Sequence, residues 1–346
     1  MANVIEKKVC PVCGSEQKDI AINDCYTCKF QFPFVTFWAS SKSFSLWNNK
    51  VREYKVQYQK SDDVEDKNKL ILGRDSVGIL AYAEHTLKII YGDGRKISTY
   101  DNIEKYVSNN NNSAFVFNDG TVMVEDDNTY GQCNVQGYTG IKEIELSPTC
   151  VFLVSHNGSL TVVGAVDEKI KSDTSSWNDI RMVSASEQLC VAVTNANTIK
   201  VSESKMVQIN KNKMLGWTNI LKVCVRNDKC VALTRDGKVN VSWDDEFIDD
   251  INNLRDIDDI LYDGTYIIAL DSSGKVHLVG KAKNKFLDAG RVDASSWKDI
   301  VAISCSNYAI CGYDSEGNLH FAGKVGGKNN ELIDEWDREI KKSLWC

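Results

Sequence analysis

Proline and histidine are scarce in this sequence, with 3 prolines and 4 histidines among 346 residues, whereas glycine occurs 22 times. Proline has no N–H to donate to a sheet, and glycine fits the tight turns between strands. Scarce proline and abundant glycine therefore favour many short strands joined by tight turns. The sequence predicts a mainly β protein.

Long apolar runs are also missing. No stretch approaches the roughly 20 apolar residues that cross a bilayer, and the opening residues MANVIEKKVC hold no apolar run of signal-peptide length. The 12 cysteines are therefore interpreted as thiols of a reducing compartment, most of them packed as small core residues. We expect a cytoplasmic protein with no membrane partner.

Motifs of known catalytic chemistry are absent as well. The sequence contains no G-x-S-x-G, no phosphate-binding loop and no H-E-x-x-H. The acidic stretch at 244–259 lacks the alternating ligands and central glycine of a calcium loop, and it is interpreted as a solvated loop. We expect no enzyme activity, no catalytic residues and no small-molecule substrate.

Charge is unevenly distributed along the chain, whose formal net charge is −7. Residues 1–60 hold nine Lys or Arg and five Asp or Glu, which gives +4 and leaves −11 for residues 61–346. An acidic body repels the phosphates of nucleic acids. Any nucleic-acid binding is therefore expected only through residues 1–60.

Four cysteines near the start form two C-x-x-C pairs, Cys10 with Cys13 and Cys25 with Cys28. Each pair directs two thiolates to one point, and two pairs complete a tetrahedral site for one structural Zn²⁺. Two disulfides or a mononuclear iron site are the alternatives, because four thiolates also suit iron. CPVCG resembles the zinc-ribbon family, which implies a unit that docks or contacts nucleic acid.

The next residues are predicted to form a helical linker. Apolar side chains recur there at spacings of three and four, which is one face of a helix: Phe44, Trp47, Val51, Tyr54 and Tyr58. A short coiled-coil seam is the alternative. The polar stretch SDDVEDKNK at 61–69 marks a boundary. The predicted domains are thus a zinc-ribbon-like domain over 1–35, a linker over 36–69 and a third domain over 70–346.

One interval recurs seven times in the third domain, and we call the apolar residue at its start the origin of its unit. The origin precedes a glycine, or once an asparagine, by 17 positions: Val77/Gly94, Ile103/Gly120, Ile141/Gly158, Ile180/Asn197, Ile220/Gly237, Ile257/Gly274 and Ile300/Gly317. Several units open with W-x-[DN]-I, and alternating apolar residues follow each turn, as in a strand after a hairpin. After a short first unit of 26 residues, the spacing of 37–43 residues between origins matches a four-stranded propeller blade.

The pattern predicts a seven-bladed β-propeller. The fourth strand of each blade is expected in the less regular stretch before the next W-x-[DN]-I. The first unit has no room for one between Gly94 and Tyr100. We therefore expect the C-terminal segment 324–346 to supply a strand there and to close the ring.

Three stretches carry a family resemblance: EHTLKIIYGDG at 84–94, the W-x-D-I units and NTYGQC at 128–133. They resemble the regulator-of-chromosome-condensation repeat over about residues 70–325, although only the second unit keeps the G-Q element and only the first keeps H-T. The resemblance implies a seven-bladed propeller. Members of that family include exchange factors for a small GTPase, a β-lactamase inhibitor and modules of signalling proteins, all of which act by binding.

The turns between first and second strands are the candidate binding surface. They lie seven and eight residues after each origin and are expected to project from one face around the central channel. Non-repeating side chains on a repeated scaffold suit recognition, although ordinary variable turns are the alternative. The acidic stretch 244–259 is the rival site. The residues that we single out are Glu84, Glu187, Asp228 and Tyr308.

These features together favour a non-catalytic protein-binding scaffold or adaptor that uses one propeller face, with the zinc domain for docking. An inhibitor or exchange-type regulator of a partner enzyme or GTPase is one alternative. A nucleic-acid-associated protein that binds through the basic zinc ribbon is another. All three readings place the activity in a surface rather than in a reactive group.

The cysteine pairs lead to a first prediction. The full chain, purified in metal-free buffer, is expected to hold one zinc ion, measured by elemental analysis. Cys10→Ser should unfold the metal-dependent unit and leave the thermal transition of residues 70–346 nearly unchanged, because the two cores are separate. Protein that contains neither zinc nor iron would contradict the metal site.

Overall fold

The computed structural model describes residues 8–9, 16–17, 69–72, 76–81, 85–91, 96–207, 209, 211–244, 246–282, 290–306 and 309–323. The chain divides into two compact units, Met1–Asp66 and Lys67–Cys346. In the first unit, the described residues form an antiparallel pair of short strands, β1 (Lys8–Val9) and β2 (Glu16–Gln17). The predicted zinc ligands, the predicted linker helix and the segment 324–346 lie outside the described residues.

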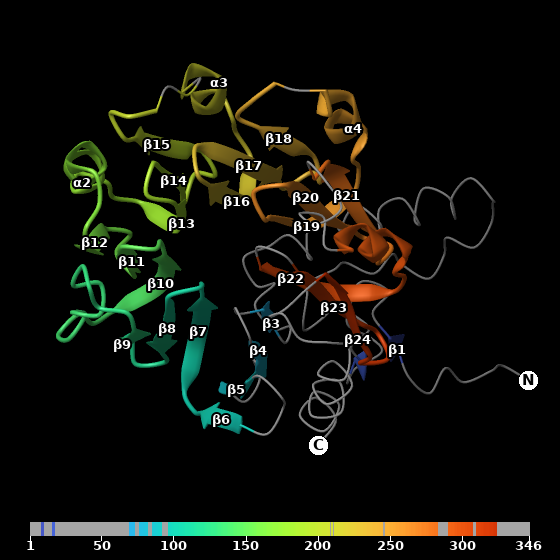
Figure 1. Ribbon diagram of the computed structural model, residues 1–346, viewed down its shortest axis with the longest axis horizontal. Helices are drawn as coiled ribbons and strands as arrows, with labels where there is room; N and C mark the ends of the chain where they lie inside the picture. Colours follow the sequence, from blue (N-terminus) through green and yellow to red (C-terminus); the bar gives the residue numbers. More distant parts are fainter. Residues whose placement is uncertain are drawn as a thin grey trace, which may run out of the picture. The chain divides into compact units, whose positions relative to one another are not determined.

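The second unit is a ring of antiparallel sheets (Figure 1). Within the described residues one sheet has four strands and six sheets have three. The four-stranded sheet contains β3 (Lys69–Leu72), β4 (Ser76–Ala81), β5 (Thr86–Tyr91) and β6 (Lys96–Tyr100). The three-stranded sheets are β7 (Ile103–Ser108), β8 (Asn112–Phe117) and β9 (Val122–Asp126); β10 (Ile141–Leu146), β11 (Cys150–Ser155) and β12 (Leu160–Gly164); β13 (Ile180–Ala185), β14 (Leu189–Thr194) and β15 (Ile199–Glu203); β16 (Ile220–Arg226), β17 (Lys229–Thr234) and β18 (Val239–Val241); β19 (Ile257–Tyr262), β20 (Tyr266–Asp271) and β21 (Val276–Gly280); and β22 (Ile300–Ser306), β23 (Ala309–Asp314) and β24 (Leu319–Gly323).

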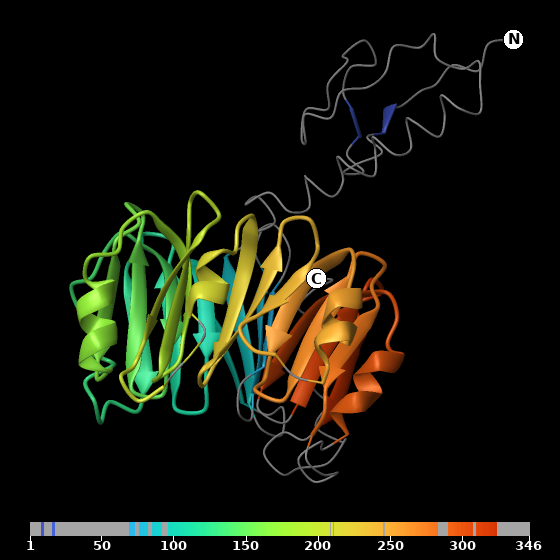
Figure 2. The same ribbon diagram turned by 90° about the horizontal axis from the view of Figure 1, so that it is seen from above.

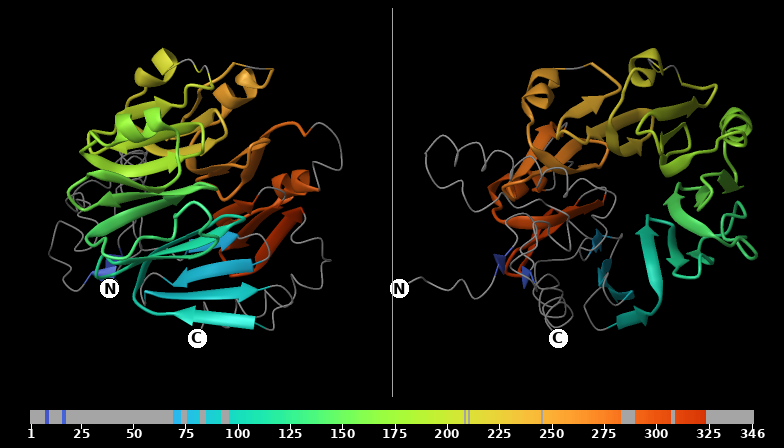
Figure 3. Two further views of the ribbon diagram at one scale, coloured as in Figure 1. Left: turned by 60° about the vertical axis from the view of Figure 1, so that its left-hand side comes forward. Right: turned by 180° about the vertical axis from the view of Figure 1, so that it is seen from behind.

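The first strand of each sheet lies at the centre of the ring, where it contacts the first strands of the two neighbouring sheets. The contacts run from β3 through β7, β10, β13, β16 and β19 to β22, and β22 contacts β3 again. Figure 2 shows the sheets edge-on, and Figure 3 shows the ring from behind. Seven sheets in a closed ring make a seven-bladed β-propeller, so the predicted fold of this domain is confirmed.

The prediction of a fourth strand in every blade is wrong. After the third strand, four blades have a short helix at the outer edge of the ring: α2 (Glu168–Thr174), α3 (Lys211–Leu215), α4 (Ile248–Asn253) and the 3₁₀ helix η3 (Arg291–Ser296) (Figure 1). Asp167 caps α2 by accepting the N–H of Lys169 at 2.8 Å, and Ile170 is fully buried against its blade. A capped helix with one buried apolar residue can cover the third strand without forming backbone hydrogen bonds to it. None of the described helices has the length and apolar composition needed to cross a membrane.

The register of the first unit also needs correction. Val77 lies in β4, the second strand of its blade, because β3 is the strand at the centre. His85, directly before β5, therefore lies at the opposite end of its blade from the first turns. His85 has a φ of 51°, and its carbonyl accepts the N–H of Ile103 at 2.8 Å. It thus occupies the place that the turn glycine takes in the other blades.

The [DN]-I motif marks a backbone position with a left-handed conformation. The residue before each origin has a positive φ: Asn102 61°, Gly140 66°, Asp179 63°, Asn219 58°, Asp256 55° and Asp299 57°. Asn, Asp and Gly tolerate this conformation better than other residues. The origin N–H next to it donates to the turn residue of the preceding blade, as Ile180 does to Gly158 at 2.9 Å. A Cβ on Gly158 would lie 2.9 Å from the backbone nitrogen of Asp179, so a larger residue at Gly158 would force the backbone at this junction to shift.

His277 and His320 are each half-buried and paired within their own blades. His277 donates to Asp271 at 2.7 Å and His320 donates to Asp314 at 2.8 Å. Each aspartate also accepts backbone N–H groups of the turn between the second and third strands. In the part of the chain that the structure describes, no three His, Cys, Asp or Glu side chains are grouped as metal ligands.

The turn glycines lead to a prediction about stability. Gly237 has a φ of 76°, and its carbonyl accepts the N–H of Ile257 in the next blade. Gly237→Val should lower the free energy of unfolding by about 1–3 kcal/mol, because a β-branched residue is strained there. Lys238→Ala, at the neighbouring exposed position, should change it by less than about 0.5 kcal/mol. Equal midpoints for both variants in chemical denaturation would contradict this role of Gly237.

The aspartate–histidine pairs lead to a prediction about pH. Partial burial acts to raise the pKa of Asp314, but hydrogen bonds from His320, Asn318 and the turn N–H groups lower it from 3.8 to about 2. A lowered pKa in the folded state stabilises the fold above the unfolded pKa, and this stabilisation is lost as pH falls through the folded pKa. The difference in unfolding free energy between wild type and Asp314→Asn should be largest above pH 4 and shrink toward pH 2. A difference that does not change over this range would contradict the assignment.

Candidate functional site

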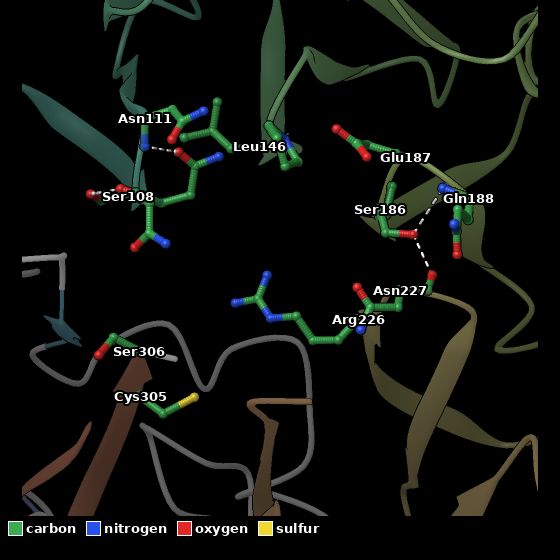
Figure 4. A pocket seen from close by; sticks show the side chains of 14 residues that line it. Ser108, Asn111, Leu146, Ser186, Glu187, Gln188, Arg226, Asn227, Cys305 and Ser306 are labelled. Carbon is green, nitrogen blue, oxygen red and sulfur yellow. Dashed lines mark hydrogen bonds between the residues drawn. The ribbon is translucent and has the colours of Figure 1, made fainter. Parts of the chain in front are cut away.

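A cavity of about 270 Å³ lies where the first turns of five blades meet (Figure 4). Its wall consists of the ends of β7, β10, β13, β16 and β22 and of the turns that follow them. We call it the channel-mouth cavity, because these are the strands that surround the centre of the ring. Most of the side chains that line it are polar, and the apolar ones include Leu146 and Pro148.

Six residues after its origin, each three-stranded blade has a position that begins the first turn. In four blades the side-chain oxygen at this position accepts backbone N–H groups of the same turn. The acceptors are Asn109 and Asp263, with two bonds each of 2.7–2.8 Å, Ser186, with two of 3.1 Å, and Ser147, with one of 3.4 Å. Of the two remaining three-stranded blades, the one that begins with β22 has Ser306 at this position, and the one that begins with β16 has Arg226. The position is therefore a turn cap in most of the repeat.

Arg226 departs from this role because a guanidinium has no hydrogen-bond acceptor. In its blade the ladder extends by the pair Arg226 and Lys229, as it does by Ser306 and Ala309 in another blade, and Asn227 adopts a φ of 53°. The Arg226 side chain, freed from capping, extends into the middle of the channel-mouth cavity (Figure 4). Its Nε is buried and has no hydrogen-bond partner among the described residues.

Below the cavity, charged side chains link neighbouring central strands. Lys105 of β7 pairs with Glu143 of β10, and Lys222 of β16 pairs with Asp259 of β19 at 2.6 Å. Burial acts to lower the pKa of Lys222, but the Asp259 carboxylate raises it above its ordinary value. These charges are satisfied by each other across adjacent blades.

Glu145 lies close to Arg226 on the channel side of β10. It accepts a hydrogen bond from the Ser184 hydroxyl at 3.0 Å, and that hydroxyl oxygen accepts the N–H of Val225 at 3.0 Å. Burial raises the pKa of Glu145, while the positive charges of Arg226 and Lys105 act to lower it. The guanidinium is thus near a carboxylate to which it makes no hydrogen bond in the described part of the structure.

Thiols in and near the cavity are not activated. Burial raises the pKa of Cys305, which lines the cavity, to about 12, and the pKa of Cys224 to about 11. The thiolate is the nucleophilic form of cysteine. At neutral pH both groups are therefore protonated and weak nucleophiles.

The structure brings many of the predicted first-turn residues together. Glu187 lines the cavity, and Asp228 is exposed on the adjacent β16–β17 turn. Tyr308 and Glu84 lie outside the described residues. The predicted first-turn residues that line the cavity are Asn110, Asn111, Pro148, Glu187, Gln188 and Asn227. Their role in binding stays a prediction.

Arg226 is the site residue that reasoning from the sequence missed. The search covered positions seven and eight after each origin, whereas Arg226 is at position six. Position six is Asn, Ser or Asp in five units, alanine in the first and arginine in one. A single arginine at a position that otherwise holds small or polar residues was the signal by which the sequence could have identified Arg226 as a site residue.

The rival acidic stretch has a different structure from the expected solvated loop. Residues Ile248–Asn253 form α4, whose Ile251 is buried and whose first turn includes Asp249 and Asp250. Acidic side chains stabilise the first turn of a helix. Part of the negative charge in 244–259 therefore has a structural role at the outer edge of the ring (Figure 1).

Comparisons with known proteins find likeness only at the level of structure. No family model and no curated protein matches the chain. The CRINKLY WD40 ectodomain of the receptor kinase ACR4 from Arabidopsis thaliana aligns with a TM-score of 0.50 and 9% identity, over 75% of this chain and 94% of that one. The ectodomain of the receptor kinase CR4 from Physcomitrella patens aligns with a TM-score of 0.50 and 8% identity, over 74% and 72%.

A third solved structure is Prp20p from Saccharomyces cerevisiae, which binds Gsp1p and histones. It aligns with a TM-score of 0.48 and 11% identity, over 82% of this chain and 88% of that one. At such low identity, a structural likeness concerns the course of the backbone and not the chemistry of a site. The two likenesses with a TM-score of 0.50 therefore show that the chain shares the propeller fold.

Proposed function

We propose that the propeller is a non-catalytic protein-binding module that grips its partner with the face of first turns. The channel-mouth cavity carries the proposal, because side chains that differ from blade to blade converge there from five blades. A repeated scaffold with a non-repeating surface is suited to recognising one particular shape. The face also exposes charged groups, such as Glu187 and Asp228, that the fold does not need.

A protein partner suits this face better than a free small molecule. Pockets for drug-sized ligands usually enclose about 300–1,000 Å³, and this cavity of about 270 Å³ is smaller. It can hold one side chain or chain end of a partner, while the surrounding turns contact the rest. The zinc domain is proposed as a second docking unit, held by Cys10, Cys13, Cys25 and Cys28.

The test is the loss of a partner by charge reversal on this face. A partner captured from the source organism by wild-type protein is purified, and its Kd is measured for each variant. Glu187→Lys combined with Asp228→Lys should weaken binding about tenfold or more, because rim charges select the partner surface. Glu246→Lys combined with Asp250→Lys, at the rival acidic stretch, should leave the Kd nearly unchanged. Loss of binding only in this second variant would move the binding surface to the outer edge.

A further inference from the structure

We propose that the channel-mouth cavity receives one carboxylate of the partner protein and that Arg226 is its anchor. This inference rests on the proposed function and adds the chemistry of the contact. The carboxylate belongs to an Asp or Glu side chain or to a chain terminus. Its neighbours in the partner include a Lys or Arg, which faces Glu187 and Asp228 at the rim.

The first argument is that Arg226 breaks the repeat at a cost. The blades that keep Asn, Ser or Asp at this position gain up to two hydrogen bonds in the turn. The Arg226 blade gives these up, and it also holds a buried Nε–H without a partner among the described residues. A buried donor that makes no hydrogen bond costs about 1–3 kcal/mol. A ligand with two oxygens in the plane of the guanidinium would accept from Nε and from a terminal nitrogen together.

The second argument is the geometry of the cavity. The Arg226 side chain extends from the end of β16 toward the side of the cavity where Asn111 and Ser306 lie, whereas Gln188 lies beyond Asn227 (Figure 4). Amide and hydroxyl groups can donate hydrogen bonds to an anion that the guanidinium holds. Asn111 and Ser306 come from two different blades, so the polar groups on the guanidinium side of the cavity do not belong to one turn.

The third argument is charge, which favours a carboxylate over a phosphate. Arg226 is the one cationic side chain among the described residues that line the cavity, and Glu187 lines it as well. Glu145 also interacts electrostatically with the guanidinium. A phosphate group carries a charge of about −1.5 to −2 at neutral pH, and it would meet these two carboxylates with a single positive charge to balance it. A carboxylate carries one negative charge, which one guanidinium matches.

The rim explains why the partner's acid should have a basic neighbour. Glu187 and Asp228 are exposed beside the cavity, on the turns of two adjacent blades. A partner segment with several acids in a row would be repelled there, whereas a Lys or Arg next to the anchoring acid would be attracted. The recognised pattern is therefore one acid with an adjacent base.

The experiment uses the full-length chain and short fluorescent peptides as probes. One peptide has a central Glu flanked by Lys in a Ser/Ala background, and matched peptides replace Glu by Gln or by phosphoserine. A further pair places Glu at the C-terminus, with the terminal carboxylate free or amidated, which distinguishes an internal acid from a chain end. Wild-type protein should bind the Glu peptide about tenfold or more tightly than the Gln and phosphoserine peptides.

Arg226→Gln should remove this preference, and Arg226→Lys should restore only part of it, because an ammonium keeps the charge without the planar pair of donors. Lys229→Gln is the matched control. It removes one positive charge from the same hairpin, where Lys229 pairs with Arg226 in the ladder but places its Nζ 4.8 Å from the ring centre of Trp243. It should keep the preference for Glu. Thermal unfolding of each variant checks that the fold is intact.

Several results would overturn the proposal. They are equal binding of the Glu and Gln peptides, preference for phosphoserine, no measurable binding of any peptide by wild-type protein, or an equal loss in Arg226→Gln and Lys229→Gln. The captured partner separates this proposal from the one on which it rests. If Arg226→Gln binds that partner normally while Glu187→Lys with Asp228→Lys does not, the binding face is right and the anchor is wrong. If neither variant affects binding, the face itself is wrong.

Discussion

At six of the seven junctions between blades, the described residues show one backbone hydrogen bond that joins a blade to the next, and two residues in the left-handed conformation make it possible. The origin N–H of one blade donates to the turn residue of the preceding blade, and both that turn residue and the residue before the origin have a positive φ. Glycine, asparagine and aspartate occupy these positions because other residues are strained there. The interval of 17 residues between origin and turn residue recurs in the sequence because each of these two residues makes this contact with a neighbouring blade. His85 shows that the contact rather than the residue type is kept, since it takes the same conformation and makes the same bond.

Because the backbone and the buried second strands hold the ring together, the side chains toward the channel and in the first turns are free to differ. Some of that freedom supports the fold, as in the pairs of Lys105 with Glu143 and of Lys222 with Asp259 between adjacent central strands. Nearer the mouth, most blades still use the first residue of the turn as a cap. The residues that follow the cap differ from blade to blade, and these residues line much of the channel-mouth cavity.

Arg226 occupies a position that caps the first turn in most blades, but its side chain carries a positive charge and only hydrogen-bond donors. Its guanidinium extends into the cavity and interacts electrostatically with the carboxylate of Glu145, to which it makes no hydrogen bond in the described residues. The thiol of Cys305 in the same cavity stays protonated because it is buried. The chemistry at the mouth is therefore that of charge and hydrogen bonding. This is the chemistry of recognition, and it agrees with a module that binds a protein.

The sequence by itself determined the propeller, the number of its blades and, for six of them, the end at which the first turn lies, because left-handed turns and strand alternation are local properties of the chain. It also predicted that Glu187 and Asp228 belong to one face. It placed the first blade one strand out of register, since Val77 and Gly94 happen to match the interval while β3 has no turn signal before it. It predicted a fourth strand where helices such as α2 cover the blade, because the choice between a helix and a strand there depends on packing against the third strand. Only the tertiary structure decided which side chains meet at the channel mouth: Arg226, Glu145 and Ser306 come from three blades far apart in the sequence, and their distance is set by closure of the ring.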